Sequence, residues 1–149
     1  GQLQEFVKMY RKLWAESGHK AGAEQIQVAQ FCYLAEKSAE ARAGFERICK
    51  RYLETFADAV VSWKGRNESD YPGYDKMVAS ILATTPDKII AQGGAFVGSP
   101  DEVAKQVQQC IDMFGPIEPS MQINFGGSSD AEAFRTVELL AEKVFPRFN

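Results

Sequence analysis

Residues 93–115 contain a strand, a tight turn and a capped helix in direct succession. The apolar run at 95–97 is bracketed by glycines, which is typical of a short buried strand that enters a turn. Ser99 and Glu102 have the spacing of a capping box, and Pro100 suits the first position of a helix. Because a strand that leads into a one-sided helix is half of a βαβ unit, this stretch favours an α/β fold with a parallel sheet.

The apolar pattern predicts the same alternation along the rest of the chain. We expect an amphipathic helix over about residues 3–17, a strand over 25–34 and a long helix over about 39–63. A third strand is expected over 119–125, and a last helix follows a second capping box at 129–132. Strands and helices that alternate in this way predict a parallel sheet with right-handed crossovers.

Three of these helices carry an apolar stripe at helical spacing. In the last helix we expect the stripe to be buried. The stripes comprise Phe6, Met9, Tyr10, Leu13 and Trp14 in the first helix, Val103, Val107, Cys110, Ile111 and Phe114 in the central helix, and Phe134, Val137, Leu140, Ala141 and Val144 in the last.

Residues 1–149 are expected to form a single α/β domain with a loop and helix excursion at about 64–92. The polar stretch at 64–75 predicts an exposed loop, followed by a short helix near 77–82 and a further turn at 85–87. Long connections of this kind are often lids or binding loops, and an unremarkable surface excursion is an equal alternative. Candidates to face a substrate are Asp70, Tyr71 and Tyr74, although a solvated loop is the default interpretation.

Composition narrows the classes of partner. The 149 residues are 45% apolar and 25% charged, with a formal charge of −3 and no cluster of basic residues. This balance argues against nucleic acid or an anionic membrane as the main partner. Charged residues throughout positions 5–20 leave no core for a signal peptide, and no apolar run approaches a membrane span. We therefore expect a cytoplasmic protein.

The cysteines and the histidine do not predict a metal site. Cys32, Cys49 and Cys110 are far apart, and each lies within an apolar pattern, which favours buried reduced thiols. His19 is the only histidine and follows Gly18, so a helix-end role is favoured over acid–base chemistry. Without ligands at metal spacing, no metal site is predicted.

Four segments together resemble the carboxy-terminal part of the luciferase-like flavin-dependent monooxygenases, which are TIM barrels. They are the VGSPDEVAKQV turn and helix at 97–107, the NFGG sequence at 124–127, the closing ELLAEKVFPRF at 138–148, and the approach to a strand at 14–42. No single motif is specific, but their order and spacing cover nearly the whole chain.

The resemblance implies a partial TIM barrel. The three expected strand–helix units are equivalent to the last three of a (β/α)8 barrel, so the first five strands of the family have no counterpart here. The resemblance also implies an oxidoreductase that acts on a small organic substrate with O2 and reduced flavin, either FMN or a deazaflavin. The chain is then a segment of such an enzyme or a short relative, and the cofactor could be absent from so short a chain.

In such barrels the site lies at the carboxyl ends of the strands. After the second strand, backbone amides at Ser99 suit a phosphate, with simple capping as the favoured alternative. After the third, the candidate cofactor contacts are Asn124, Gly126 and Gly127, against a tight turn that needs positive φ. Residues 31–33 (Phe31, Cys32 and Tyr33) are candidates to contact the isoalloxazine ring, although a core role for at least two is favoured. No catalytic residue is identified.

Two functions remain open. The first is a flavin-dependent monooxygenase, in which the cofactor carries the chemistry and the protein orients the reactants. The second is a non-catalytic, self-associating α/β module that keeps the end of the barrel without its reaction. If the chain is stable alone, its unpaired sheet edges predict association, most simply as a symmetric homodimer. Three strand ends predict weak or no FMN binding by this chain alone.

Overall fold

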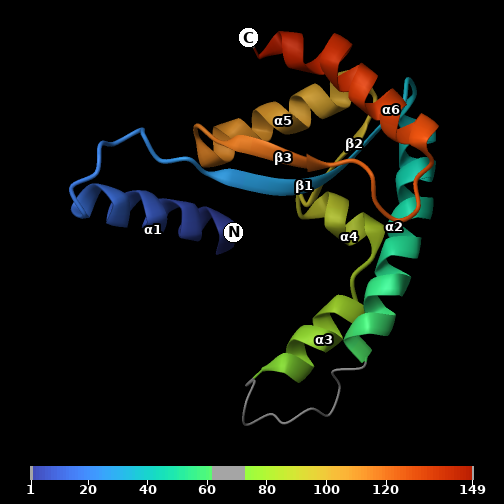
Figure 1. Ribbon diagram of the computed structural model, residues 1–149, viewed down its shortest axis with the longest axis horizontal. Helices are drawn as coiled ribbons and strands as arrows, with labels where there is room; N and C mark the ends of the chain where they lie inside the picture. The colour runs from blue at the N-terminus through green and yellow to red at the C-terminus, as the bar shows by residue number, and fades with distance from the viewer. Residues whose placement is uncertain (1, 62–72, 149) are drawn as a thin grey trace.

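The structure, a computed structural model, describes residues 2–61 and 73–148 (Figure 1). Helix residues outnumber strand residues, as predicted. The elements are α1 (Gln2–Glu16), β1 (Gln27–Leu34), α2 (Ser38–Val61), α3 (Tyr74–Leu82), α4 (Pro86–Ala91), β2 (Ala95–Gly98), α5 (Pro100–Phe114), β3 (Glu118–Gln122) and α6 (Asp130–Leu139), followed by a π turn (Leu140–Val144) and a 3-10 turn (Phe145–Arg147).

The three strands form one parallel sheet in the order β2-β1-β3. Phe31 of β1 lies opposite Ala95 of β2, and Gln27 lies opposite Glu118 of β3. The predicted α/β fold with a parallel sheet is thereby confirmed. The strand that comes first in sequence lies in the middle, so α5 carries the chain from one edge of the sheet to the other.

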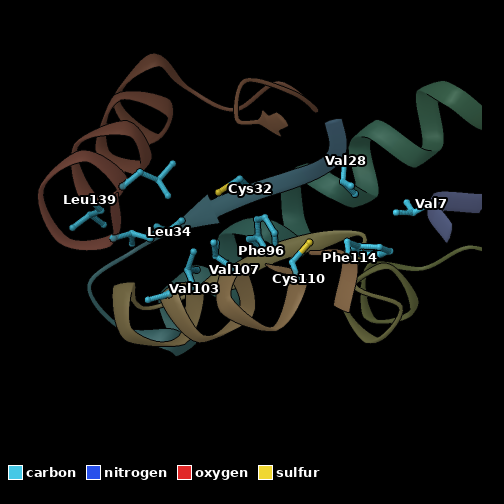
Figure 2. Close-up of a cluster of buried hydrophobic side chains, with 13 residues drawn as sticks. Val7, Val28, Cys32, Leu34, Phe96, Val103, Val107, Cys110, Phe114 and Leu139 are labelled. Carbon is cyan, nitrogen blue, oxygen red and sulfur yellow. The ribbon is translucent and has the colours of Figure 1, made fainter. Parts of the chain in front are cut away.

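Helices cover both faces of the sheet. Side chains alternate along a strand, so Cys32 and Leu34 point towards α5 and α6 while Tyr33 points towards α2. Figure 2 shows the first group, in which Val103, Val107, Cys110 and Phe114 of α5 meet Phe96 and the outer face of β1. The central stripe is therefore buried as its spacing predicts, with Ile111 partly buried at its margin.

Helix α1 lies beside the sheet rather than on it (Figure 1). Its apolar stripe is largely exposed, with Phe6, Met9 and Leu13 each about half accessible, and only Val7 enters the core. Arg11 docks the helix because its guanidinium donates to the carbonyls of Phe114 and Pro116 just after α5.

The predicted burial of the last helix is partly wrong. Phe134 and Val137 are 68% and 48% exposed, and Ala141 is exposed as well, whereas Leu140 and Val144 are buried as expected. The cause is Thr136, whose hydroxyl pairs with the backbone N–H and C=O of Leu34 at 3.2 and 3.4 Å. This contact turns α6 so that other side chains face the core.

The remaining boundaries differ little from the predictions. The third strand ends at Gln122, three residues earlier than predicted, and the turn predicted at 85–87 is the start of α4, which Thr85 caps. Asp70, Tyr71 and most of the predicted loop at 64–75 lie outside the described residues. Among the helices in the described ranges, none has an apolar stretch long enough to cross a membrane.

Candidate functional site

An aromatic cluster lies against α2, beside the middle of β1 and the turn that follows β3. We use this name for Phe31, Phe45, Tyr52, Phe56 and Phe125. The ring centroids of Phe31 and Phe125 are 4.5 Å apart, and those of Phe31 and Tyr52 are 5.2 Å apart in an edge-on arrangement. Tyr52 and Phe56 stack at 6.0 Å, because residues four apart share one face of a helix. All members except Phe45 are partly exposed, so the cluster presents aromatic surface to solvent.

Phe31, Cys32 and Tyr33, the three candidates from β1, have different surroundings. Cys32 is fully buried on the opposite face of the sheet, where burial raises the pKa of its thiol to about 12. Tyr33 is buried against α2, and its hydroxyl donates to the Glu132 carboxylate at 2.8 Å. Only Phe31 keeps part of its ring accessible, so it alone remains available to a planar ligand.

The glycines after β3 bring the chain against α2. Gly126 has φ of 58°, and a Cβ at this position would lie 2.0 Å from the carbonyl oxygen of Ile48. Gly127 has φ of 68°, and its Cβ would lie 3.1 Å from the Arg51 guanidinium. The close backbone approach that the sequence predicts is present, and its partner in this structure is α2.

Polar groups border the aromatic cluster. Asn124 is exposed, and its Oδ1 accepts from the Ser128 hydroxyl at 3.1 Å. Its amide nitrogen has no hydrogen-bond partner within the described ranges. The Arg51 guanidinium lies beside Gly127 and forms no ion pair with any residue in the described ranges. Sequence reasoning missed Arg51 and Tyr52; the spacing of Tyr52 and Phe56 along one helix was the available signal.

The amino end of α5 is already neutralised. The Glu102 carboxylate accepts from the backbone N–H of Ser99 at 2.9 Å and from its hydroxyl at 3.2 Å. It also accepts from the Ser38 hydroxyl at the start of α2, and these hydrogen bonds hold the pKa of Glu102 below its usual range. A carboxylate therefore occupies the positive helix end where a phosphate would bind.

The amino end of α6 also carries a carboxylate of its own. The Glu132 carboxylate accepts from the backbone N–H of Ser129 at 2.9 Å, from the Tyr33 hydroxyl and from the Arg47 guanidinium. The hydrogen bond to the Ser129 backbone is the main reason that the pKa of Glu132 falls to about 2. Glu132 thus joins α6, β1 and α2 at one partly exposed corner of the site.

These residues fit the ring of a flavin better than its phosphate. Phe31 and Tyr52 offer aromatic contact, and Asn124 offers a hydrogen bond, whereas both helix ends carry their own carboxylates. Nothing in this geometry assigns Ser99, Asn124, Gly126 or Gly127 to a cofactor, so those assignments stay predictions. Within the described ranges, no group of three or more His, Cys, Asp or Glu side chains could hold a metal ion. His19 stacks on Trp14 at the end of α1, with centroids 4.4 Å apart.

The solved structures that are similar to this chain include three whose names indicate their chemistry. Monooxygenase RslO1 from Streptomyces bottropensis has a TM-score of 0.70 and 27% identity, over 99% of this chain and 38% of that one. The oxygenating constituent of 3,6-diketocamphane monooxygenase from the CAM plasmid of Pseudomonas putida, in complex with FMN, has a TM-score of 0.66 and 20% identity, over 97% and 39%. The coenzyme F420-dependent tetrahydromethanopterin reductase from Methanopyrus kandleri has a TM-score of 0.58 and 12% identity, over 98% and 42%.

The chain thus spans about two fifths of the length of each of these proteins. No curated protein matches it. Residues 1–115 of the 149 match the family model described as luciferase-like monooxygenase. This match covers well over half of the chain and agrees with the partial match to larger monooxygenases, so the chain belongs to the luciferase-like monooxygenase family.

Proposed function

We propose that this chain forms one wall of the flavin site in a luciferase-like, flavin-dependent monooxygenase. Such an enzyme uses reduced flavin and O2 to oxidise a small organic substrate. Membership of the family supports the reaction class. The observation that carries the proposal is the aromatic cluster with Asn124 beside it. Asn124 and Phe125 lie just past the carboxyl end of β3, and barrels place their sites at the carboxyl ends of their strands.

The cofactor we propose is FMN or a related deazaflavin. One similar structure is in complex with FMN, and another is named as dependent on coenzyme F420. A bound reduced flavin supplies the reaction with O2, and the protein supplies orientation and exclusion of water. In this chain Phe31 and Tyr52 would contact the ring and Asn124 would donate a hydrogen bond to it.

We further propose that this chain alone binds flavin weakly and has no oxygenase turnover. Association costs at least about 4 kcal/mol, and a concave site normally encloses most of a ligand of this size. The described residues supply a ring contact and a hydrogen bond, while Glu102 and Glu132 repel the phosphate from both helix ends.

The test compares FMN with riboflavin, which carries the same ring without the phosphate. Each is titrated into the purified, isotope-labelled chain while amide NMR shifts and flavin fluorescence are followed. We expect equally weak binding of the two ligands, with shift changes confined to the aromatic cluster, Asn124 and Gly127. In the variant Asn124→Ala these changes should weaken, whereas Gln108→Ala, on the exposed face of α5, should leave them unaltered.

Two outcomes would count against the proposal. Saturable quenching by FMN at low micromolar concentration, with riboflavin much weaker, would reveal a phosphate site in this chain. Shift changes confined to residues far from the aromatic cluster would remove it from the flavin site. Gly126→Ala is unsuitable as a probe of ligand contact, because its side chain would strike the backbone of α2.

A further inference from the structure

Most arginines of the described residues are paired with a carboxylate, and Arg51 of α2 is not. The pairs are Arg11 with Glu24, Arg47 with Glu132, Arg135 with Glu36, and Arg147 with Asp101. Arg42 and Arg51 form no ion pair within the described ranges. The charge of Arg42 still acts on the Glu102 carboxylate at the start of α5. Arg51 lies elsewhere, against the turn that follows β3.

The backbone of that turn makes room for the Arg51 side chain. Gly127 has φ of 68°, and a Cβ at this position would lie 3.1 Å from Nη1, 3.2 Å from Cζ and 3.3 Å from Nε of Arg51. Three atoms of one planar group at nearly equal distances mean that the guanidinium lies with its flat face across the turn. Any side chain at position 127 would push it away.

The acceptors of this turn already have donors. Asn124 Oδ1 accepts from the Ser128 hydroxyl, and the Glu132 carboxylate accepts from Arg47 and from the backbone N–H of Ser129. The N–H of Gly127, in contrast, donates to no residue in the part of the chain that the structure describes. The turn therefore presents a cation and a neighbouring backbone donor to solvent, and an anion is the acceptor that suits both.

This cation borders the aromatic cluster. Arg51 precedes Tyr52 on α2, and Gly127 follows Phe125 by two residues. The rings of Tyr52 and Phe125 meet edge-on with centroids 6.0 Å apart, and both are partly exposed. A ligand that covers these rings and also carries a negative group can therefore place that group on Arg51.

We infer that Arg51 determines substrate specificity at this site by binding the carboxylate of an apolar organic acid. A guanidinium presents a planar fork of N–H donors that matches the two oxygens of a carboxylate. This assignment rests on the proposed function, because it names the class of substrate for that reaction. The phosphate of FMN is another anion, but it lies at the end of the ribityl chain, whereas Arg51 borders the side chains proposed to contact the ring.

The experiment compares 2-naphthoate with 2-naphthamide, which has the same rings and no charge. Each is titrated into the purified, isotope-labelled chain at low ionic strength while amide NMR shifts are followed. We expect 2-naphthoate to bind about threefold to fivefold more tightly, which is the gain typical of an exposed ion pair. The shift changes should include Gly127, and added salt should reduce the preference.

Variants of Arg51 assign the preference to its charge. Arg51→Gln should bind the two ligands equally, because the glutamine amide carries no charge. Arg51→Lys should keep part of the preference, since an ammonium retains the charge without the planar fork. Arg42→Gln is the matched control, because Arg42 is also exposed and unpaired on α2 but lies near Glu102, and it should keep the full preference.

Three results would overturn the inference: equal affinity of the two ligands for the wild type, a preference that survives in Arg51→Gln, or shift changes that leave out the turn after β3. Loss of affinity for FMN but not for riboflavin in Arg51→Gln would also overturn it, because the anion would then be the flavin phosphate. Riboflavin tests the proposed flavin site without a charged group. A chain that binds riboflavin at the aromatic cluster but shows no preference for the acid would therefore refute the role of Arg51 alone.

Discussion

Gly126 is the residue on which the turn after β3 depends most. Its positive φ and the 2.0 Å separation between a would-be Cβ and the Ile48 carbonyl make any side chain incompatible with the observed packing. We expect Gly126→Ala to lower the free energy of unfolding by about 2 kcal/mol or more, through backbone strain and displacement of α2. Urea denaturation measures this change.

Gly22 supplies the control for that substitution. It has a similar positive φ of 79°, but nothing lies within 4 Å of its would-be Cβ. Gly22→Ala should therefore cost only the conformational part, about 1 kcal/mol. Equal losses in the two variants would show that contact with α2 contributes nothing.

Glu132 makes the free energy of unfolding depend on pH. Its folded-state pKa of about 2 lies below the ordinary value of 4.5, so the stabilisation is complete above pH 4.5 and is lost as the pH falls towards 2. Its side chain is 27% exposed, so after solvent screening we expect a loss of roughly 1 kcal/mol. The free energy of unfolding is measured by urea denaturation at several pH values between 2 and 6. It should change less steeply with pH in Glu132→Gln than in the wild type. Glu138→Gln, on the exposed side of the same helix, should keep the wild-type slope.

At the scale of elements, Gln106 acts in place of a neighbouring strand for β2. Gln106→Ala would leave the N–H and C=O of Val97 unpaired, which should cost about 2 kcal/mol and promote aggregation. Gln106→Glu keeps the acceptor but loses the donor, so it should be destabilised as well. Gln109→Ala, an exposed neighbour on α5, is the control. The measurements are urea denaturation and light scattering, and unchanged behaviour of both Gln106 variants would refute this edge role.

Elements set by local signals could be predicted from the sequence. Both capping boxes form, because a serine and a glutamate three residues later interact within one turn whatever surrounds them. The buried face of α5 follows from its regular spacing for the same reason. The close backbone approach after β3 was likewise readable from Gly126 and Gly127, although not its partner.

Features set by distant contacts could not be predicted. The strand order β2-β1-β3 depends on which edges pair, and no local pattern encodes that choice. Which face of α6 is buried depends on Thr136 and on its hydrogen bonds with the backbone of Leu34. Sequence reasoning leaves such a polar residue on the surface. The aromatic cluster combines residues from β1, α2 and the turn after β3, so it exists only in the folded chain.

At the scale of the whole molecule, the three cysteines report on global and local opening. Cys32 and Cys49 lie in the cores on opposite faces of the sheet, and burial raises the pKa of their thiols to about 12 and about 11. Because the thiolate is the reactive form, both should be alkylated only when the fold opens globally. Cys110 is 7% exposed and lines a surface pocket of about 840 Å³, so local opening should suffice to expose it.

We therefore expect iodoacetamide to modify Cys110 first in the native chain, and Cys32 and Cys49 later at one common rate. Mass spectrometry of the digested protein resolves the three sites. Equal rates at Cys110 and Cys32 would mean that the pocket beside Cys110 has no local opening of its own, and the sheet would then open as one cooperative unit.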